Sequence, residues 1–390
     1  MSIGIICEYN PFHNGHLYQI NKIKESFDEP IICVMSGNFT QRGELAVSDK
    51  YSRAEIALKC GADLLLELPF PYCVSSAEFF AEAGVKILSS CGADKLSFGS
   101  ECADGEKLWN LANIANTDEF KTAYSEAARR KGNARAYFET LKSLSDDDTD
   151  ISSNDILGIE YIKAIIKNGY DIKPCPIKRA GAEYMERKLK KGEHPSASAV
   201  REAIFDNGVD KIKEFVPRPS FEILSRIDRA NIQNVERGIL LALRLLNSES
   251  LENIAVSDEG IVNRIIQCAK EADSFYEFEE SVRCKKYTDS AIRRAMWYML
   301  TGVSFEDLKQ TPAYTSLLAA NEKGREILSE LRKKDTLIPI ITKPADASAL
   351  KNSRAQRQIE LSLRADAIFT LALKNPKASA EYVRKNPIMI

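Results

Sequence analysis

From its N-terminus to Lys178, the chain alternates short apolar runs with longer stretches whose apolar residues recur at helical spacing. The apolar runs cover residues 3–7, 31–35, 64–68, 95–99 and 172–178. Near-continuous apolar strands separated by helices are typical of a parallel sheet that is covered on both faces. The pattern therefore predicts an α/β fold with a doubly wound, Rossmann-like parallel sheet, which binds nucleotides where its strands end.

Helical patterns lie between these strands and continue after them. The expected helices cover residues 17–23, 49–59, 77–88 and 106–144, and two more begin near Asn154 and at the motif that contains His194. We expect Ser48 to cap the second helix and Gly61 to end it.

The strand pattern stops at about Ser220, where Pro217 and Pro219 mark a joint in the chain. The sequence thus predicts a first domain over residues 1–218, with a helical insertion at about 104–150. An all-helical domain is expected over residues 219–390.

All three histidines of the chain fall in two short motifs. His13 and His16 belong to His13-Asn14-Gly15-His16, which follows the first strand and a turn and begins a helix. Free backbone N–H groups and the positive end of the helix dipole attract phosphate there, and Gly15 permits close approach. Two imidazoles three residues apart share one face, so both can donate to a polyphosphate and neutralise charge that develops on it. The spacing suits nucleotidyl transfer.

Two other interpretations of this motif are open. A His-x-x-His pair can be half of a metal site, but neither a Cys nor another His supplies a third ligand, so no metal site is predicted. The two histidines can also be ordinary surface residues, although the preceding strand and the rarity of histidine favour the phosphate role. The acidic run at residues 146–148 is expected to be a solvated loop rather than a metal site.

A second motif runs from His194 to Arg201. Ser196, Ser198 and Arg201 stand at another expected helix start, which suits the β- and γ-phosphates of a nucleotide. The alternative is an ordinary capping sequence with a surface arginine.

These motifs resemble known ones. His13-Asn14-Gly15-His16 after a first strand looks like the His-x-Gly-His signature of the nucleotidyltransferase superfamily, and Ser196 to Arg201 resembles its Ser/Thr-rich phosphate motif. A narrower resemblance, to the bacterial tRNA(Met) cytidine acetate ligase family, extends over most of the chain. It is carried by residues 35–44, Asp49-Lys50, Arg53, and residues 67–70, 98–101 and 153–161.

The resemblance implies a nucleotidyltransferase fold and an ATP-dependent ligase. Such an enzyme activates acetate as acetyl-adenylate and transfers the acetyl group to N4 of the wobble cytidine of elongator tRNA(Met), and Mg²⁺ is expected to arrive with ATP. The implied catalytic residues are His13, His16, Ser196, Ser198 and Arg201. The implied ATP-binding residues are Cys7, Glu8, Tyr9, Asn10, Pro11, Phe12, His13, Asn14, Gly15, His16, Leu17, Tyr18, Gln19, Ile20, Gly99, Asn154, Arg179 and Ala180. Taken without the resemblance, Gly99 reads as a strand-end turn and Asn154 as a helix cap.

The loop over residues 36–44 follows the carboxyl end of the second strand. Its polar residues Asn38, Gln41 and Arg42 are therefore candidates to face the acetate. Asp49, Lys50 and Arg53 lie within one helical turn and either join this pocket or form a surface ion-pair cluster.

Charge is distributed unevenly along the chain. The net charge is −2, but residues 281–390 hold 20 Lys and Arg against 11 Asp and Glu, so this C-terminal segment carries +9 and the segment 1–280 carries −11. This asymmetry suggests that the C-terminal part binds a polyanion. The candidates for tRNA binding are Arg283, Lys285, Lys286, Tyr287, Arg293 and Arg294, with Tyr287 stacking on a base and the lysines holding phosphates. A basic helix end is the rival explanation.

Composition limits where such a protein works. Nine cysteines without a Cys-x-x-Cys pair indicate reduced thiols. No apolar run approaches the roughly 18 residues of a membrane span, and the N-terminal run stops at Glu8, too short for a signal peptide. A cytoplasmic protein without membrane contact is expected. Two rival functions remain: a cofactor-making adenylyltransferase, which leaves the helical part unexplained, and a non-catalytic tRNA-binding protein, which needs neither phosphate motif.

Overall fold

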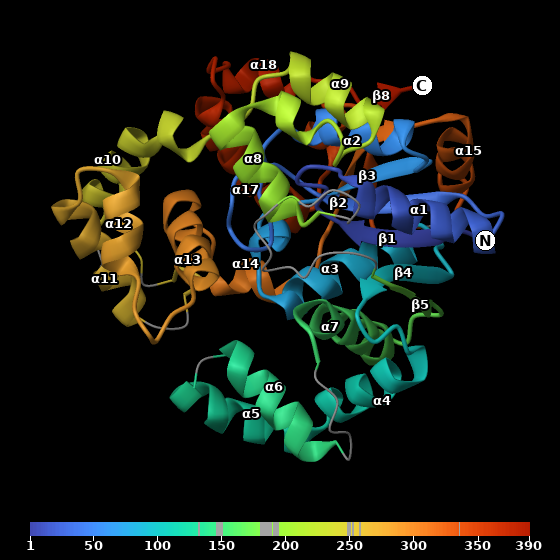
Figure 1. Cartoon of the computed structure of the whole chain (residues 1–390), viewed down its shortest axis with the longest axis horizontal. Helices are drawn as coiled ribbons and strands as arrows, with labels where there is room; N and C mark the ends of the chain where they lie inside the picture. The colour runs from blue at the N-terminus through green and yellow to red at the C-terminus, as the bar shows by residue number, and fades with distance from the viewer. Residues whose placement is uncertain are drawn as a thin grey trace.

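The computed structural model describes residues 1–131, 133–145, 151–179, 189, 195–247, 251, 253–256, 259–334 and 336–390. A twisted sheet runs through its centre and is covered by helices on both faces (Figure 1). Among the described residues, no helix has the length and apolarity that crossing a membrane requires.

Five parallel strands form the part of the sheet that the sequence predicts. They are β1 Ile3–Cys7, β2 Ile31–Ser36, β3 Leu64–Leu68, β4 Lys95–Ser100 and β5 Lys173–Lys178, in the spatial order β5-β4-β1-β2-β3. The chain passes from β1 outward to β3 and then returns to the other side of β1 for β4 and β5. The doubly wound parallel sheet is thus confirmed, with its reversal point between β1 and β4.

The C-terminal part is not entirely helical, which corrects the expectation for residues 219–390. It supplies β6 Thr315–Ala320, β7 Ile340–Ile341 and β8 Ile388–Met389. β6 pairs with β3 in antiparallel orientation, and β7 and β8 both pair with β6. Because β6 completes the central sheet, the two parts of the chain share one sheet, and a domain boundary near residue 218 stays a prediction.

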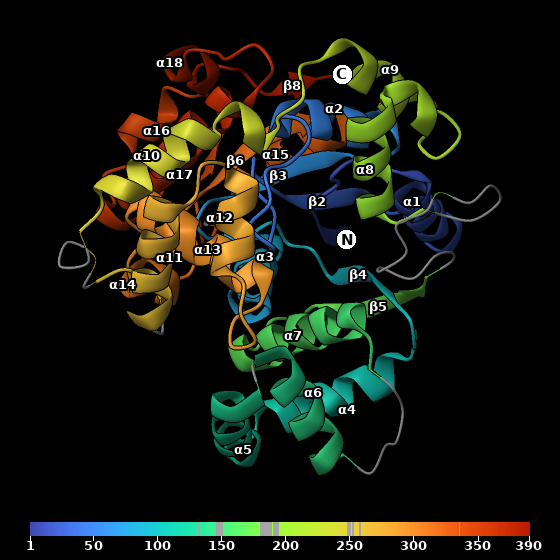
Figure 2. The same cartoon turned by 60° about the vertical axis from the view of Figure 1, so that its left-hand side comes forward.

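The helices largely follow the predicted ranges. They are α1 Asn14–Ser26, α2 Lys50–Lys59, α3 Ala77–Ser90, α4 Gly105–Asn116, α5 Asp118–Lys131, α6 Asn133–Leu144, α7 Ser153–Asn168, α8 Ala197–Asn207, α9 Arg218–Arg226, α10 Glu236–Leu245, α11 Glu259–Glu271, α12 Phe275–Val282, α13 Asp289–Thr301, α14 Phe305–Lys309, α15 Glu322–Leu331, α16 Asp346–Ala349, α17 Ser353–Ala372 and α18 Ser379–Val383. Helices α4 to α6 gather beside α7, and α10 to α13 form a second group on another side of the sheet (Figures 1 and 2).

Alternate strand residues point to opposite faces, so the sheet separates two apolar cores. Val34 and Leu64 pack on the face covered by α3 and α7, whereas Cys33 and Leu65 pack on the face covered by α1 and α2. Both faces are buried, which explains why the strands are apolar throughout rather than alternating.

Two helix caps differ from the sequence expectations. The cap of α2 is Asp49 rather than Ser48, because the Asp49 carboxylate accepts from the N–H groups of Tyr51 and Ser52. Asn154 is not the cap of α7, since Ser152 occupies that position. The side chain of Asn154 is therefore available for another contact.

Candidate nucleotide site

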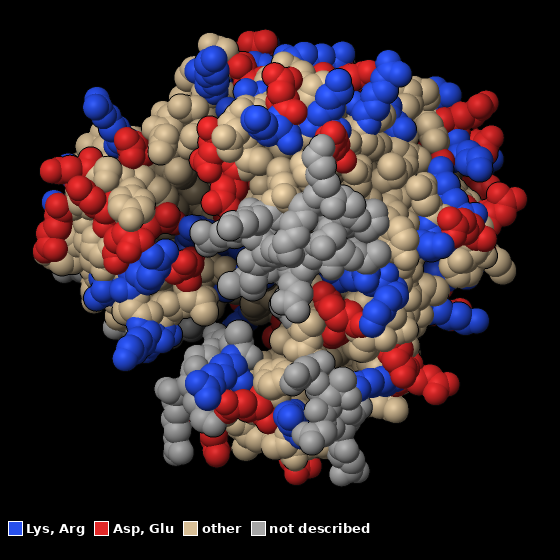
Figure 3. Space-filling view, viewed as in Figure 1, with Lys and Arg blue, Asp and Glu red and all other residues tan. Residues whose placement is uncertain are grey.

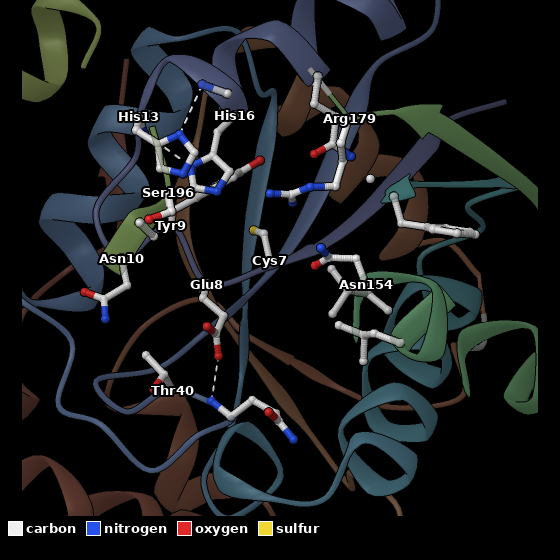
Figure 4. A pocket seen from close by; sticks show the side chains of 18 of the residues that line it. Cys7, Glu8, Tyr9, Asn10, His13, His16, Thr40, Asn154, Arg179 and Ser196 are labelled. Atoms are coloured by element: carbon white, nitrogen blue, oxygen red, sulfur yellow. Dashed lines mark hydrogen bonds between the residues drawn. The ribbon is translucent and has the colours of Figure 1, made fainter. Parts of the chain in front are cut away.

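A pocket of about 300 Å³ opens at the carboxyl ends of β1 and β4, where the strand order reverses. Its walls come from the β1–α1 turn, the loop after β2, the ends of β4 and β5, and the starts of α7 and α8 (Figure 4). This is the position at which open α/β sheets bind nucleotides.

The two histidines of the first motif form the turn into α1. His13 is the N-cap, and its Nδ1 accepts from the N–H of Gly15 at 3.0 Å. Nδ1 of His16 accepts from the N–H of His13 at 3.2 Å, and the two rings stack with centroids 3.8 Å apart. A ring nitrogen that accepts carries no proton, so each ring keeps its proton on Nε2. Both rings line the pocket, each as a neutral hydrogen-bond donor.

The environment of His16 keeps it neutral. Burial, with the nearby positive charge of Arg179, lowers the pKa of His16 to about 3. By itself this ring is therefore a dipole and a hydrogen-bond donor at physiological pH. The negative charge of a bound phosphate would raise its pKa, so the charge-neutralising role that the sequence suggests stays a prediction.

The lowered pKa of His16 predicts a loss of stability in acid. An unfolded histidine takes up a proton near pH 6.5, whereas folded His16 does so only near pH 3. Between these values the unfolded state binds more protons than the folded state. The free energy of unfolding should therefore decrease as the pH is lowered, by up to about 1.4 kcal/mol per pH unit. Urea unfolding at pH 7 and pH 5 should show a smaller decrease for His16→Asn than for the wild type. An equal decrease in both would contradict this reasoning.

The second phosphate motif meets the first. Ser196 caps α8, and its hydroxyl accepts from the N–H of Ala199 at 3.1 Å. Arg201 donates through Nη1 to the carbonyl oxygen of Asn10 at 2.9 Å, which ties α8 to the β1–α1 turn. Ser196 and Arg201 line the pocket, whereas Ser198 lies outside its lining and accepts from Arg201 at 3.3 Å.

Glu44 joins the arginine of this motif to another helix. Its carboxylate accepts from Nη2 of Arg201 at 2.7 Å and pairs with Nη1 of Arg293 on α13 at 3.3 Å. Glu44 was not singled out in the sequence, although it ends the family-like run over residues 35–44. A phosphate that binds Arg201 would have to share this arginine with Glu44.

The opposite wall of the pocket is organised by Glu101. Its Oε1 accepts from Nδ2 of Asn154 at 2.6 Å and pairs with Nε of Arg179 at 3.1 Å. Gly99 lies beneath them, and a Cβ there would stand 3.2 Å from Cγ of Arg179. Figure 4 shows Asn154 and Arg179 across the cavity from His13 and His16. Glu101 was also missed, and again the only signal was its place in a family-like motif, residues 98–101.

Several predicted ATP-binding residues lie away from the pocket. Of the segment 7–20, those that line it are Cys7, Glu8, Tyr9, Asn10, His13, Gly15, His16, Tyr18 and Gln19, and those that do not are Pro11, Phe12, Asn14, Leu17 and Ile20. Phe12 and Ile20 are fully buried in the core. Asn14 donates to the carbonyl oxygen of Glu214 at 2.9 Å instead. Ala180 and His194, and the acidic run 146–148, lie outside the described residues.

Only some of the candidates for an acetate pocket lie at the cavity. Gln41 and Arg42 line the cavity, but Asn38, Asp49, Lys50 and Arg53 do not. Arg53 has no exposed surface. Its guanidinium donates to the carbonyl oxygens of Ser48 at 3.1 Å and Ser36 at 3.1 Å, and also to those of Glu8 and Gly37. This arginine fastens the ends of β1 and β2 together.

Lys50 and Asn38 belong to a buried polar network that reaches the C-terminal helices. Nζ of Lys50 lies 2.8 Å from Glu67 and 2.9 Å from Asp366, and Nδ2 of Asn38 donates to Asp366 and to the hydroxyl of Tyr382, both at 2.8 Å. Burial opposes the charged form of Lys50, but the two carboxylates hold the pKa of Lys50 above its ordinary value. The network joins α2 and β3 to α17 and α18.

Asp49 has a related contact. Its carboxylate caps α2 and pairs with Nζ of Lys385 at 3.2 Å. The Asp49 carboxylate is thus engaged in contacts within the protein, as is the ammonium group of Lys50.

The candidates for tRNA binding near α13 fall into two groups, the first of which lies at the surface. Arg283 pairs with Glu280 and, at 3.0 Å, with Asp289 on the surface, and Lys285 is exposed. Nζ of Lys286 lies 5.1 Å from the centroid of the Tyr287 ring. In Figure 3, Lys and Arg are interspersed with Asp and Glu over the coloured part of the visible face, so the positive balance of the C-terminal part is not gathered there into one basic surface.

Arg293 and Arg294 face the pocket loop instead. Nε of Arg293 pairs with Glu279 at 2.7 Å, in addition to its contact with Glu44. Nη1 of Arg294 donates to the carbonyl oxygen of Gln41 at 3.3 Å, and Nε1 of Trp297 donates to that of Gly43 at 2.7 Å. Helix α13 therefore supports the loop that forms one wall of the cavity.

Comparison with known proteins agrees with this geometry. A family model described as HIGH Nucleotidyl Transferase matches residues 1–383. The chain is 40% identical to the tRNA(Met) cytidine acetate ligase of Caldanaerobacter subterraneus subsp. tengcongensis and 38% identical to that of Thermoanaerobacter sp., each over 96% of both chains. It is similar to the crystal structure of apo TmcAL of Thermotoga maritima, with a TM-score of 0.92, 33% identity and full coverage of both chains. The form of that protein bound with alpha-thio ATP gives 0.89 and 32%, covering 100% of this chain and 99% of the other.

Proposed function

Because the chain belongs to the HIGH nucleotidyl transferase family, we propose that it is a tRNA(Met) cytidine acetate ligase that consumes ATP. The observation that supports this most directly is the meeting of both phosphate motifs in one pocket. Ser196 lies beside His13 and His16 in Figure 4, and Arg201 donates to the carbonyl oxygen of Asn10 in the same turn. The nearly full-length likeness to ligases of that name supports the substrate class.

In the first half-reaction, a carboxylate oxygen of acetate attacks the α-phosphate of ATP. A P–O bond forms, the bond to the bridging oxygen of the β-phosphate breaks, and pyrophosphate leaves. The Nε2–H groups of His13 and His16 donate to the phosphate oxygens, and Arg201 holds the charge of the leaving pyrophosphate. Preformed donors on a fixed helix start need no rearrangement as this charge develops.

In the second half-reaction, the exocyclic amine of cytidine attacks the carbonyl carbon of acetyl-adenylate. A C–N bond forms, the C–O bond to the phosphate breaks, and AMP leaves. Phe80, Phe98 and Tyr161 give the cavity an apolar wall, which limits the water that would hydrolyse the anhydride.

The part of the chain that the structure describes forms no dedicated metal site. Among the described residues, no group of three or more His, Cys, Asp or Glu side chains could hold a metal ion. We propose that Mg²⁺ enters with the phosphates of ATP. A cytoplasmic location is proposed because ATP and tRNA are found there, and because all nine cysteines are free thiols.

The test is to incubate the protein with ATP, labelled acetate and bulk tRNA. The expected result is labelled N4-acetylcytidine in nuclease digests of the tRNA, with AMP and pyrophosphate as the other products. Acetyl label on protein lysines, on the terminal ribose of tRNA or on no macromolecule would refute the proposal. Pyrophosphate release with acetate alone, with tRNA alone and with both separates the ligase from an adenylyltransferase and from a non-catalytic tRNA-binding protein.

The exposed basic segment offers a prediction about tRNA. Replacing Lys285 and Lys286 by Glu should weaken tRNA binding and lower the slope of its salt dependence by about 2, because two phosphate contacts are lost. Acetyl-adenylate formation should be spared. Filter binding at several salt concentrations and acetate-dependent pyrophosphate exchange measure the two effects.

The matched control is the double change of Lys351 and Lys377 to Glu, which alters charge equally at exposed positions elsewhere in the C-terminal part. It should leave the slope near that of the wild type. A fall in acetyl-adenylate formation as steep as the fall in tRNA acetylation would show that the Lys285–Lys286 segment serves the ATP site or the fold.

A further inference from the structure

Glu8 stands at the carboxyl end of β1 and lines the pocket. Its Oε1 accepts from the N–H of Gln41 at 2.6 Å. Among the described residues, this is the one hydrogen bond of its carboxylate, which takes part in no ion pair there. Figure 4 shows the side chain of Glu8 reaching away from His13 and His16 towards the loop that carries Thr40. The first half-reaction described above makes no use of this carboxylate.

Among the described residues that line the pocket, the other groups that could accept a proton are already engaged. Glu44 is paired with both Arg201 and Arg293. His13 and His16 accept backbone N–H groups at Nδ1, and the pKa of His16 is about 3, which makes it a poor base. Of the carboxylates that the structure describes at the pocket, Glu8 is thus the one best placed to accept a proton from a substrate.

The proposed function requires such an acceptor. When the exocyclic amine of cytidine attacks a carbonyl carbon, its nitrogen becomes positively charged and must lose a proton before AMP leaves productively. Resting on that function, we propose that Glu8 binds the exocyclic amine of the target cytidine and takes the proton that this amine loses. In this step the N–C bond forms, the C–O bond to the phosphate breaks with its electron pair going to AMP, and one N4 proton moves to the Glu8 carboxylate, which later returns it to water.

The surroundings of Glu8 suit a base. Burial raises the pKa of the Glu8 carboxyl above its usual value, although the N–H of Gln41 and the charge of Arg201 oppose this effect. A carboxylate with a raised pKa accepts a proton more readily than one in water.

Glu8 also lies between the phosphate motifs and the loop after β2. His13, His16 and Arg201 stand on the phosphate side, whereas the loop bonded to Glu8 rests on α13, through Arg294 and Trp297. Helix α13 follows the basic segment proposed to meet tRNA. A carboxylate here also distinguishes bases, because it accepts from the amine of cytidine but repels the oxygen that uridine carries at the same position.

The test is Glu8→Gln, measured separately in the two half-reactions. The amide oxygen of Gln can still accept from the N–H of Gln41, so the loop contact is kept while the base is removed. Acetate-dependent ATP–pyrophosphate exchange reports the first half-reaction. Single-turnover transfer from enzyme-bound acetyl-adenylate to tRNA reports the second. We expect transfer to fall about 100-fold or more, the scale of a general base, and at least tenfold more than exchange. Glu8→Asp should recover part of the transfer rate.

Glu44→Gln is the matched control, since it removes a second carboxylate of the same pocket that is held by two arginines. It should lower exchange at least as much as transfer. Equal losses of exchange and transfer in Glu8→Gln, or a transfer rate near that of the wild type, would overturn the role of Glu8. If the wild-type protein made no acetylcytidine at all, the proposed function itself would fail, which is a different outcome from a defect confined to the variant.

Discussion

Replacing His16 by Ala is expected to lower the rate of acetyl-adenylate formation by roughly 100-fold or more while leaving the fold intact. The ring lines the pocket, and its Nε2–H is a donor whose orientation is fixed by the bond from the N–H of His13 to Nδ1. Loss of one preorganised donor to an oxyanion typically costs this much. Acetate-dependent pyrophosphate exchange measures the effect directly.

His13→Ala should show a somewhat smaller loss of rate, together with a loss of stability. His13 is the N-cap of α1, and removal of such a cap costs about 1 kcal/mol. Lys22→Ala, on the same helix, serves as the control and should retain activity. Lys22 pairs with Glu25 near the surface and lies 5.8 Å from the centroid of the Tyr18 ring, but it does not line the pocket. Near-normal exchange by a folded His16→Ala protein would remove the central role given to the histidine turn.

The histidine turn and the parallel sheet were predictable because both are local. Each parallel strand is a short apolar run bounded by turn residues, and its helix follows directly in the chain. The turn after β1 carries His13, Gly15 and His16 in one short motif, so their closeness in space follows from their closeness in sequence. The strand order, with β1 at the reversal point, then places this turn in the pocket.

Strand β6 was missed because its evidence is not local. Its six residues are Thr, Ser, Leu, Leu, Ala and Ala, a composition as suitable for a buried helix turn as for a strand. What makes it a strand is pairing with β3, in which Ala320 opposes Leu64 from the N-terminal part of the chain. Tertiary pairing decided its structure, and nothing in the neighbouring sequence indicated that partner.

Most of the acetate candidates lie outside the lining of the pocket for a similar reason. Lys50 and Asn38 follow β2, where a site is expected, but their partners Asp366 and Tyr382 lie near the other end of the chain. A sequence can show that polar residues stand near a strand end. It cannot show that distant carboxylates already occupy them. Residue type and spacing therefore predicted which residues of the two phosphate motifs share a pocket better than they predicted the acetate candidates.

Replacing Lys50 by Met is expected to destabilise the protein by about 3–5 kcal/mol rather than to weaken acetate binding specifically. Glu67 and Asp366 both contact Nζ of Lys50, at 2.8 and 2.9 Å, and all three side chains are at least nine-tenths buried. Without the ammonium group, two buried carboxylates would lie close together with no cation between them, which is the costly way to break a buried ion pair. Urea unfolding measures the loss.

The control for this variant is Lys385→Met. Lys385 pairs with Asp49 at 3.2 Å, but 39% of its side chain is exposed, so its removal should cost no more than about 1 kcal/mol. The two explanations of Lys50 predict opposite results. If Lys50 held the acetate, Lys50→Met would unfold near the wild-type urea concentration and show a raised KM for acetate alone. Because this lysine lies outside the lining of the nucleotide pocket and its ammonium is held by two carboxylates, we expect the loss to appear in the unfolding midpoint, with KM for acetate little changed in the fraction that remains folded.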